Sequence, residues 1–233
     1  LVAADHSLPC VQSRIASGLA TFDTLLGGGI EKGTSTLLVG APGTGKSSLA
    51  VQFTVAAAQR GENAALFIFD ETVQTLRTRC EGLGMPIGAL VDGGRIVLRQ
   101  VDPAELSPGE LVQEIRDQVA QRNVSVLVID SLNGYLNAMP DERYLIGQLH
   151  ELLTFLGHAG VATMLVGAQH GIIGTTMHSP VDASYLADAV VLLRYFESDG
   201  EVRQAISVVK KRSGDHERSI HGLSMGPDGI RIG

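Results

Sequence analysis

The feature that most constrains this chain is the stretch GAPGTGKS at residues 40–47, which directly follows the apolar run STLLV. It matches the pattern G-x-x-x-x-G-K-[ST] at every fixed position. Glycines let such a loop curl until its backbone N–H groups converge on phosphates, and a helix that begins there directs its positive end at the same group. A strand pattern precedes the loop and a helix pattern, SSLAVQFTVAAAQR, follows it. These features predict a site for a nucleoside triphosphate rather than an ordinary glycine-rich turn.

The residues of this loop receive separate roles. Lys46, which we also count as catalytic, would reach the β- and γ-phosphates, and the Ser47 hydroxyl would bind Mg²⁺. We expect the nucleotide to be contacted by Gly40, Gly43, Thr44, Gly45, Lys46, Ser47 and Ser48.

The composition narrows the classes of function. A length of 233 residues fits one large α/β domain, with two small domains as the alternative. A net charge of −7 and an aromatic content of 4% without Trp argue against binding to nucleic acid. Two cysteines outside any metal-ligand spacing suit a reducing cytoplasm, and no apolar run predicts a membrane span or signal peptide. The chain begins with Leu1, which is consistent with a piece of a longer polypeptide.

Apolar runs along the chain predict strands that alternate with helices. After an arm or linker at residues 1–17, we predict one domain over residues 18–233. Buried strands are expected at residues 34–40, 64–69, 95–101, 124–130 and 161–168. One intervening helix starts at a capping-box signature, Ser107 with Glu110. This order is typical of an α/β fold with a mostly parallel, doubly wound sheet, to which the tail would add antiparallel strands and a hairpin around a Pro-Asp-Gly turn.

Polar side chains follow directly after several of these strands. Because ligands bind outside the carboxyl ends of parallel strands, we expect the phosphate loop, Asp70, Glu71, Asp130 and Gln169 to gather at one edge. Asp130 would hold Mg²⁺ directly or through water. Asp70 and Glu71 would orient or deprotonate an attacking water or hydroxyl. The alternative is that these carboxylates cap the turn or helix that follows each strand.

A basic cluster lies near the C-terminus, where nine positions contain Lys210, Lys211, Arg212, His216 and Arg218. Charges of this kind stabilise negative charge that develops on a transferred phosphate. The alternative is an edge strand that is kept from aggregating by its charge. Since an edge strand lies far from its own phosphate loop, we expect the cluster to be offered to a neighbouring subunit.

Four stretches of the chain together resemble the KaiC family of RecA-like ATPases: GLATFDTLLGGGIEKGTSTLLVGAPGTGKSS, LFIFDET, VLVIDSLNGYL and VVKKRSGDHER. The resemblance runs from about residue 14 to the end and looks closer to the C-terminal ATPase half of two-domain members. It implies a RecA-like P-loop NTPase fold and a homo-hexamer that holds ATP and Mg²⁺ between subunits, with regulatory protein partners.

The resemblance also assigns residues. The family's Lys-x-Arg, which contacts the neighbour's nucleotide, matches Lys210 and Arg212, and the histidine that follows matches His216. We add Lys211 to this nucleotide-binding set. The family more often has Glu at the position of Asp70, so the side chain here is shorter.

Phosphorylation of the chain by itself is a further implication. KaiC phosphorylates adjacent Ser and Thr residues at the subunit interface, and these positions fall on Ser184 and Tyr185, with Ser179 near a third hydroxyl position. The alternative for Ser184 is an ordinary surface serine. The resemblance therefore implies an ATPase and autokinase in signalling or circadian-type timing. Two other functions stay open, a RecA/RadA-like DNA-dependent ATPase and a nucleotide-dependent assembly module.

Overall fold

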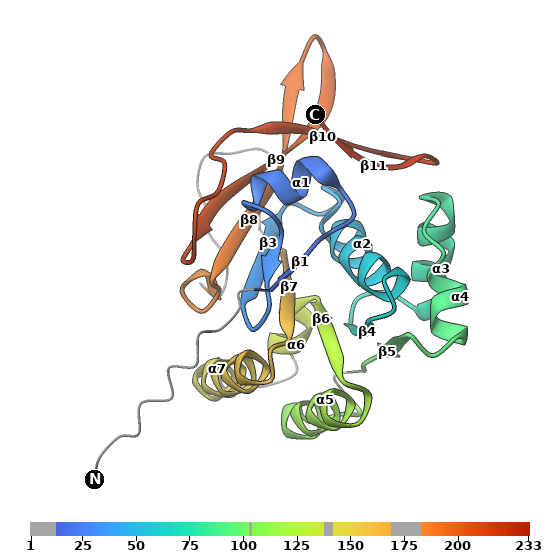
Figure 1. Ribbon diagram of the computed structural model, residues 1–233, viewed down its shortest axis with the longest axis vertical. Coiled ribbons are helices and arrows are strands. Elements are labelled where there is room, and N and C mark those ends of the chain that lie inside the picture. Colours follow the sequence, from blue (N-terminus) through green and yellow to red (C-terminus); the bar gives the residue numbers. More distant parts are fainter. Residues whose placement is uncertain (1–12, 103, 138–141, 169–182) are drawn as a thin grey trace.

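A computed structural model describes residues 13–102, 104–137, 142–168 and 183–233, and these residues form a nine-stranded sheet beside a two-stranded one. From one edge to the other, the strands of the large sheet are β11 (Gly229–Ile232), β10 (His221–Gly226), β9 (Glu201–Lys211), β8 (Ala189–Ser198), β3 (Ser35–Gly40), β7 (Ala162–Ala168), β6 (Val124–Asp130), β4 (Asn63–Ile68) and β5 (Ile96–Gln100) (Figure 1).

The strands from β8 to β5 in this order pair in parallel, with β3 between β8 and β7. From β8 outward, β9, β10 and β11 each pair antiparallel to their neighbour. This arrangement confirms the predicted α/β class, the mostly parallel sheet and the antiparallel C-terminal hairpin. Each strand expected before residue 170 is present within one or two residues of its predicted bounds.

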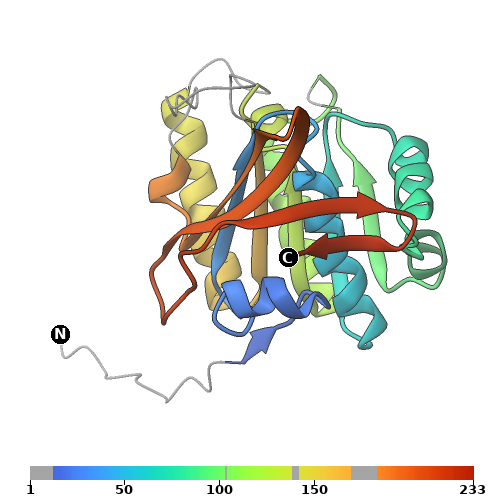
Figure 2. The ribbon, with the colours of Figure 1, turned by 90° about the horizontal axis from the view of Figure 1, so that it is seen from above.

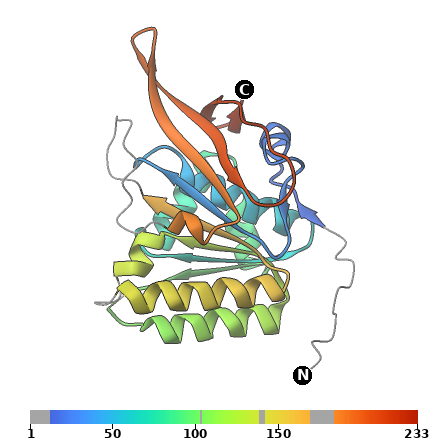
Figure 3. The same ribbon diagram turned by 90° about the vertical axis from the view of Figure 1, so that its left-hand side faces the viewer.

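Helices cover both faces of the sheet. One face carries α1 (Ala20–Leu25), α2 (Lys46–Gln59), α3 (Val73–Gly82) and α4 (Ile87–Asp92), and the other carries α5 (Pro108–Arg122) and α7 (Glu142–His158) (Figure 3). Alternate residues of one strand enter the two cores. In β6, Val126 and Val128 pack with the first group of helices, whereas Leu127 and Ile129 pack with the second. The continuous apolar run of β6 is therefore explained by burial on both faces.

Several short elements were absent from the sequence prediction. They are β1 (Arg14–Ile15), β2 (Ile30–Glu31), α4, α6 (Leu132–Asn137) and the 3₁₀ turn η1 (Ala183–Tyr185). β1 pairs with β2, and Ile15 is buried in the core beside α1, so the segment before residue 18 contributes to the packed structure. The domain boundary at residue 18 stays a prediction. None of the described helices is long and apolar enough to span a bilayer.

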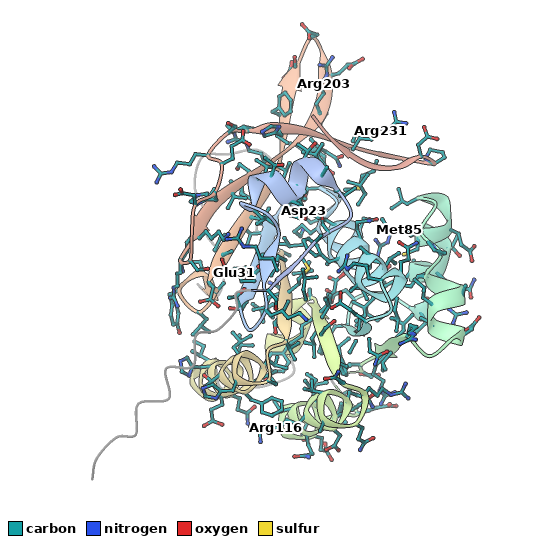
Figure 4. The ribbon with its side chains drawn as sticks, in the orientation of Figure 1. Asp23, Glu31, Met85, Arg116, Arg203 and Arg231 are labelled. Carbon is teal, nitrogen blue, oxygen red and sulfur yellow. The ribbon has the colours of Figure 1, made fainter. Side chains whose placement is uncertain are left out.

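The C-terminal strands reach two distant parts of the molecule. The β8–β9 hairpin projects from the body, and Arg203 lies near its tip (Figure 4). β10 and β11 cross above α2, and the turn between them lies beside α3 (Figure 2). At that end the Pro227 carbonyl approaches Gly84, just after α3. Residues late in the sequence are thereby placed next to the phosphate loop.

Candidate nucleotide and metal site

The loop between β3 and α2 has the backbone that phosphate binding requires. Gly45 caps α2 with φ of 95°, and Gly43 has φ of 79°, both in the left-handed region that glycine adopts without strain. Gly40 ends β3. The first N–H groups of α2 have no partner within the helix and point out of its N-terminus, where an anion is stabilised.

The loop forms one wall of a cleft of about 330 Å³, lined by Gly43, Gly45, Lys46, Ser47, Ser48, Asp70, Glu71, Arg79, Asp130 and Met225. A larger hollow of about 650 Å³ lies between the β8–β9 and β10–β11 hairpins, but no Asp or Glu side chain of the described residues lines it. The smaller cleft combines donors, carboxylates and a helix N-terminus, so it is the candidate site. It brings together the loop residues and the acidic residues expected after β4 and β6.

Lys46 makes a hydrogen bond within the phosphate loop. Its Nζ donates to the Ala41 carbonyl oxygen at 2.8 Å, and the residue is only 7% exposed. The Thr44 hydroxyl donates to the same carbonyl at 2.8 Å, so this predicted contact residue also holds the shape of the loop. Burial lowers the pKa of Lys46, while the nearby Asp130 carboxylate raises it. A phosphate would offer the ammonium a charged acceptor in place of the neutral carbonyl.

Asp130 is a buried carboxyl group with unused hydrogen-bonding capacity. Its Oδ2 has no hydrogen-bond partner among the described residues. Burial raises its pKa to about 6, although a hydrogen bond from the Ser47 hydroxyl lowers it. An unpartnered carboxylate oxygen beside a hydroxyl fits Mg²⁺, which binds one or two protein oxygens and completes its shell with phosphate oxygens and water. Within the described ranges no cluster of three His, Cys, Asp or Glu side chains is arranged to bind a metal.

Asp70 and Glu71 follow β4 at the same edge of the sheet. The Phe69 N–H donates to the Asp130 carbonyl oxygen at 2.8 Å, which joins the ends of β4 and β6. Gly134 lets α6 pack closely against this strand end, because a Cβ at residue 134 would overlap Phe69 and touch an Asp70 carboxylate oxygen. Asp70 is exposed, whereas Glu71 is half-buried and paired with Arg79.

Sequence reasoning missed three residues at this site. Arg79 from α3 lines the cleft, and Met225 from β10 covers Gly45 so closely that a Cβ there would overlap the methionine methyl group. Gln204, from the β8–β9 hairpin, donates to the Gly43 carbonyl oxygen at 2.9 Å. No local motif marks these residues, because long-range packing brings them to the loop.

The residues of the basic cluster near the C-terminus lie in two different environments. Lys210 Nζ donates to the carbonyl oxygens of Ser184 at 2.7 Å and Ala187 at 2.8 Å. Arg212 donates to the Tyr185 carbonyl oxygen and pairs with Asp188 at 3.6 Å. These two residues therefore contact the segment that contains Ser184 and Tyr185.

Lys211 lies in the other environment. Its side chain is 5% exposed, its Nζ donates to the Leu26 carbonyl oxygen at 2.6 Å, and Glu31 lies 3.8 Å away (labelled in Figure 4). These contacts do not support its predicted place at a neighbour's nucleotide, which stays a prediction without structural support. His216 and Arg218 lie in the loop between β9 and β10.

Two of the phosphoacceptor candidates, Ser184 and Tyr185, lie in η1. Tyr185 is 50% exposed, and Ser184 is half-buried. Ser179 and Gln169 lie outside the described residues.

Comparisons with known proteins agree with this geometry. A protein-family model described as "ATPase: KaiC" matches residues 15–233. The chain is 28% identical over 214 residues to the circadian clock protein KaiC3 of Synechocystis sp., covering 88% of this chain and 42% of the relative. It is 26% identical over 223 residues to the circadian clock oscillator protein KaiC of Acaryochloris marina, and 27% identical over 222 residues to that of Thermostichus vulcanus. Each of these two alignments covers 94% of this chain and 42% of the relative.

The chain therefore spans less than half the length of these relatives. The extent of the family match corresponds to a single ATPase half of such a protein. With its complete phosphate loop and mostly parallel sheet, this chain belongs to the KaiC family of RecA-like ATPases.

Proposed function

We propose that this chain binds ATP with Mg²⁺ in the cleft beside the phosphate loop and hydrolyses it. The observation that carries the proposal is that three strand ends meet there: the loop after β3, Asp70 and Glu71 after β4, and Asp130 at the end of β6. Family membership supports the nucleotide class.

Each side chain has a task in this proposal. Lys46 exchanges the Ala41 carbonyl for the β- and γ-phosphates. Ser47 and Asp130 would hold Mg²⁺, which when bound neutralises charge on the phosphates. Glu71, with Asp70 beside it, orients the attacking water and accepts its proton.

The proposal extends to a ring of identical subunits with a nucleotide between neighbours, in which Lys210 and Arg212 serve the next subunit's ATP. Arg212 supports this extension, because 54% of its side chain is exposed at the surface of the single chain. The relatives are named as circadian clock proteins, which supports a role in timing or signalling. A cytoplasmic location stays a prediction of the sequence.

Hydrolysis is tested by phosphate release with Mg²⁺-ATP, alongside nucleotide affinity. Lys46→Ala is expected to lose affinity, because it removes a charge-assisted contact to the phosphates. Glu71→Gln should keep affinity and lose about 10²- to 10⁴-fold in kcat, the usual contribution of a general base. Glu81→Gln, an exposed substitution in α3 outside the cleft, is the matched control and should leave both unchanged. Equal rates in wild type and Glu71→Gln would contradict the assigned base.

Assembly is tested by light scattering with ATP, with ADP and without nucleotide. A hexamer favoured by ATP and weakened by Arg212→Ala is expected. One size under all three conditions would contradict the ring and leave the hydrolysis result standing. A several-fold stimulation of the ATPase by single-stranded DNA would instead favour the DNA-dependent alternative.

We propose autophosphorylation as a second activity, because the exposed Tyr185 lies in a segment whose carbonyls bind Lys210 and Arg212. Incubation with Mg²⁺-ATP followed by mass spectrometry should find phosphate on Ser184 or Tyr185. Turnover of ATP without phosphate on either residue would overturn this second activity alone.

A further inference from the structure

Arg79 links three elements at the edge of the nucleotide cleft. It belongs to α3 and pairs through Nη2 with the Glu71 carboxylate, in the loop after β4. Through Nη1 it donates to the Ser48 hydroxyl at 2.8 Å, in the first turn of α2. One guanidinium thus joins the proposed base to the helix that begins at the phosphate loop.

This arrangement restrains Glu71. The glutamate precedes α3 and lies outside any helix or strand, so its backbone does not fix its long side chain. Holding such a side chain in one rotamer costs conformational entropy, and a specific partner is needed to offset that cost. The planar fork of Arg79 contacts both Glu71 and Ser48, which the single ammonium of a lysine would match poorly. No corresponding ion pair is seen for Asp70 among the described residues, and Asp70 is exposed.

We propose that Arg79 is a positioning residue for ATP hydrolysis, which holds the Glu71 carboxylate over the cleft and so selects Glu71 rather than Asp70 as the group that orients water. The inference rests on the proposed ATPase function. Arg79 makes no contact with the phosphates in this proposal, so Arg79 affects turnover only through the position of Glu71. Small displacements of a reacting group have large effects on rate, which is why an ion pair outside the chemistry matters for kcat.

The test is a double-mutant cycle of Arg79→Ala and Glu71→Gln, with kcat and KM for ATP measured in each variant. Arg79→Ala is expected to lower kcat by about 10- to 100-fold, part of the contribution of a general base, and to change KM by less than about threefold. In the Glu71→Gln background it should cause no further loss. Arg79→Lys should lie between, because one of the two contacts can be retained.

Two further measurements separate positioning from other roles. Affinities for a fluorescent ATP analogue and for ADP should be the same in Arg79→Ala as in wild type, and melting temperatures show whether each variant folds. Arg77→Ala is the matched control, because Arg77 lies in the same helix but pairs with Asp92 outside the cleft, at 2.9 Å. It should leave kcat unchanged.

Each alternative outcome overturns the inference in a recognisable way. A loss of affinity for the ATP analogue but not for ADP would mean that Arg79 binds the γ-phosphate itself. An equal loss of kcat in the wild-type and Glu71→Gln backgrounds would mean a structural role only. Normal turnover in Arg79→Ala, with turnover lost in Glu71→Gln, would overturn the positioning role but not the ATPase. A wild-type protein without ATPase activity would overturn the proposed function, and the inference with it.

Discussion

Replacing Asp130 with Asn is expected to remove a loss of stability that the nucleotide-free wild type undergoes as the pH rises to neutral, although it also removes a proposed metal ligand. Burial raises the pKa of this carboxyl group from 3.8 to about 6. A raised pKa in the folded state means that ionisation disfavours folding. One pKa unit corresponds to about 1.4 kcal/mol, so the shift of about 2 units corresponds to about 3 kcal/mol between the fully protonated and fully ionised limits.

The sign of the pH dependence follows from the same shift. Below the unfolded pKa the group is protonated in both states, and the folded protein carries no penalty. As the pH rises through the folded pKa of about 6, the unfolded state has already released its proton and this part of the stability is lost. Between pH 4 and 7.5 the free energy of unfolding of Asp130→Asn should gain about 2–3 kcal/mol relative to wild type. The cost of the unpartnered amide does not depend on pH, so it cancels from this difference.

The measurement is urea unfolding of both proteins at several pH values between 4 and 7.5, without Mg²⁺ or nucleotide. Ser47→Ala provides a second variant, because it removes the hydrogen bond that lowers the pKa of Asp130 and should raise that pKa further. Addition of Mg²⁺-ADP should stabilise wild type more than Asp130→Asn, since a charged carboxylate binds the metal more tightly than a neutral amide. A difference between wild type and Asp130→Asn that stays constant with pH would refute the reasoning.

Three further substitutions test other contacts. Lys211→Ala should lower the free energy of unfolding by about 2–3 kcal/mol, because it removes buried charged contacts to Glu31 and the Leu26 carbonyl. The ATP affinity of the folded protein should stay unchanged. A lower ATP affinity at an unchanged melting temperature would instead support the nucleotide-binding role predicted from the sequence. Gly45→Ala should cost about 1–2 kcal/mol from its positive φ, plus a clash with Met225 that Met225→Ala relieves, as measured by urea unfolding. Ser107→Ala breaks the observed capping box and should cost about 1 kcal/mol in the same assay, whereas no change would mean that the cap contributes nothing.

Most of the fold could be predicted because its elements are long and carry a clear pattern. Leu111, Ile115 and Val119 recur at helical spacing in α5 and are all buried, and Ser107 and Glu110 form the predicted capping box. The short elements were missed, because a strand of two residues or a helix of six contains too few repeats of the apolar pattern to be recognised. β1 exists because Ile15 finds a core position next to α1, which no local signal shows.

The candidate site divides in a similar way. Asp70, Glu71 and Asp130 were predicted because each follows an apolar strand, and the fold itself brings strand ends to one edge. In the sequence, no motif distinguishes Arg79 from other basic residues, and the packing of α3 places it at the cleft. Met225 reaches Gly45 through the path of β10 across α2, which no spacing in the sequence indicates.

The basic cluster near the C-terminus shows what strand geometry adds to composition. Successive side chains of an extended chain point to opposite sides, so Lys210 near the end of β9 and Arg212 directly after it lie on one side, and Lys211 lies on the other. Accordingly, Lys210 and Arg212 contact the segment around Tyr185, while Lys211 is buried against the loop after α1. This alternation gives a physical reason for a Lys-x-Arg spacing rather than a run of cations. Because Lys211 is 5% exposed and Arg212 54%, Arg212 is the better placed of the two to make the contact proposed with a second subunit's nucleotide.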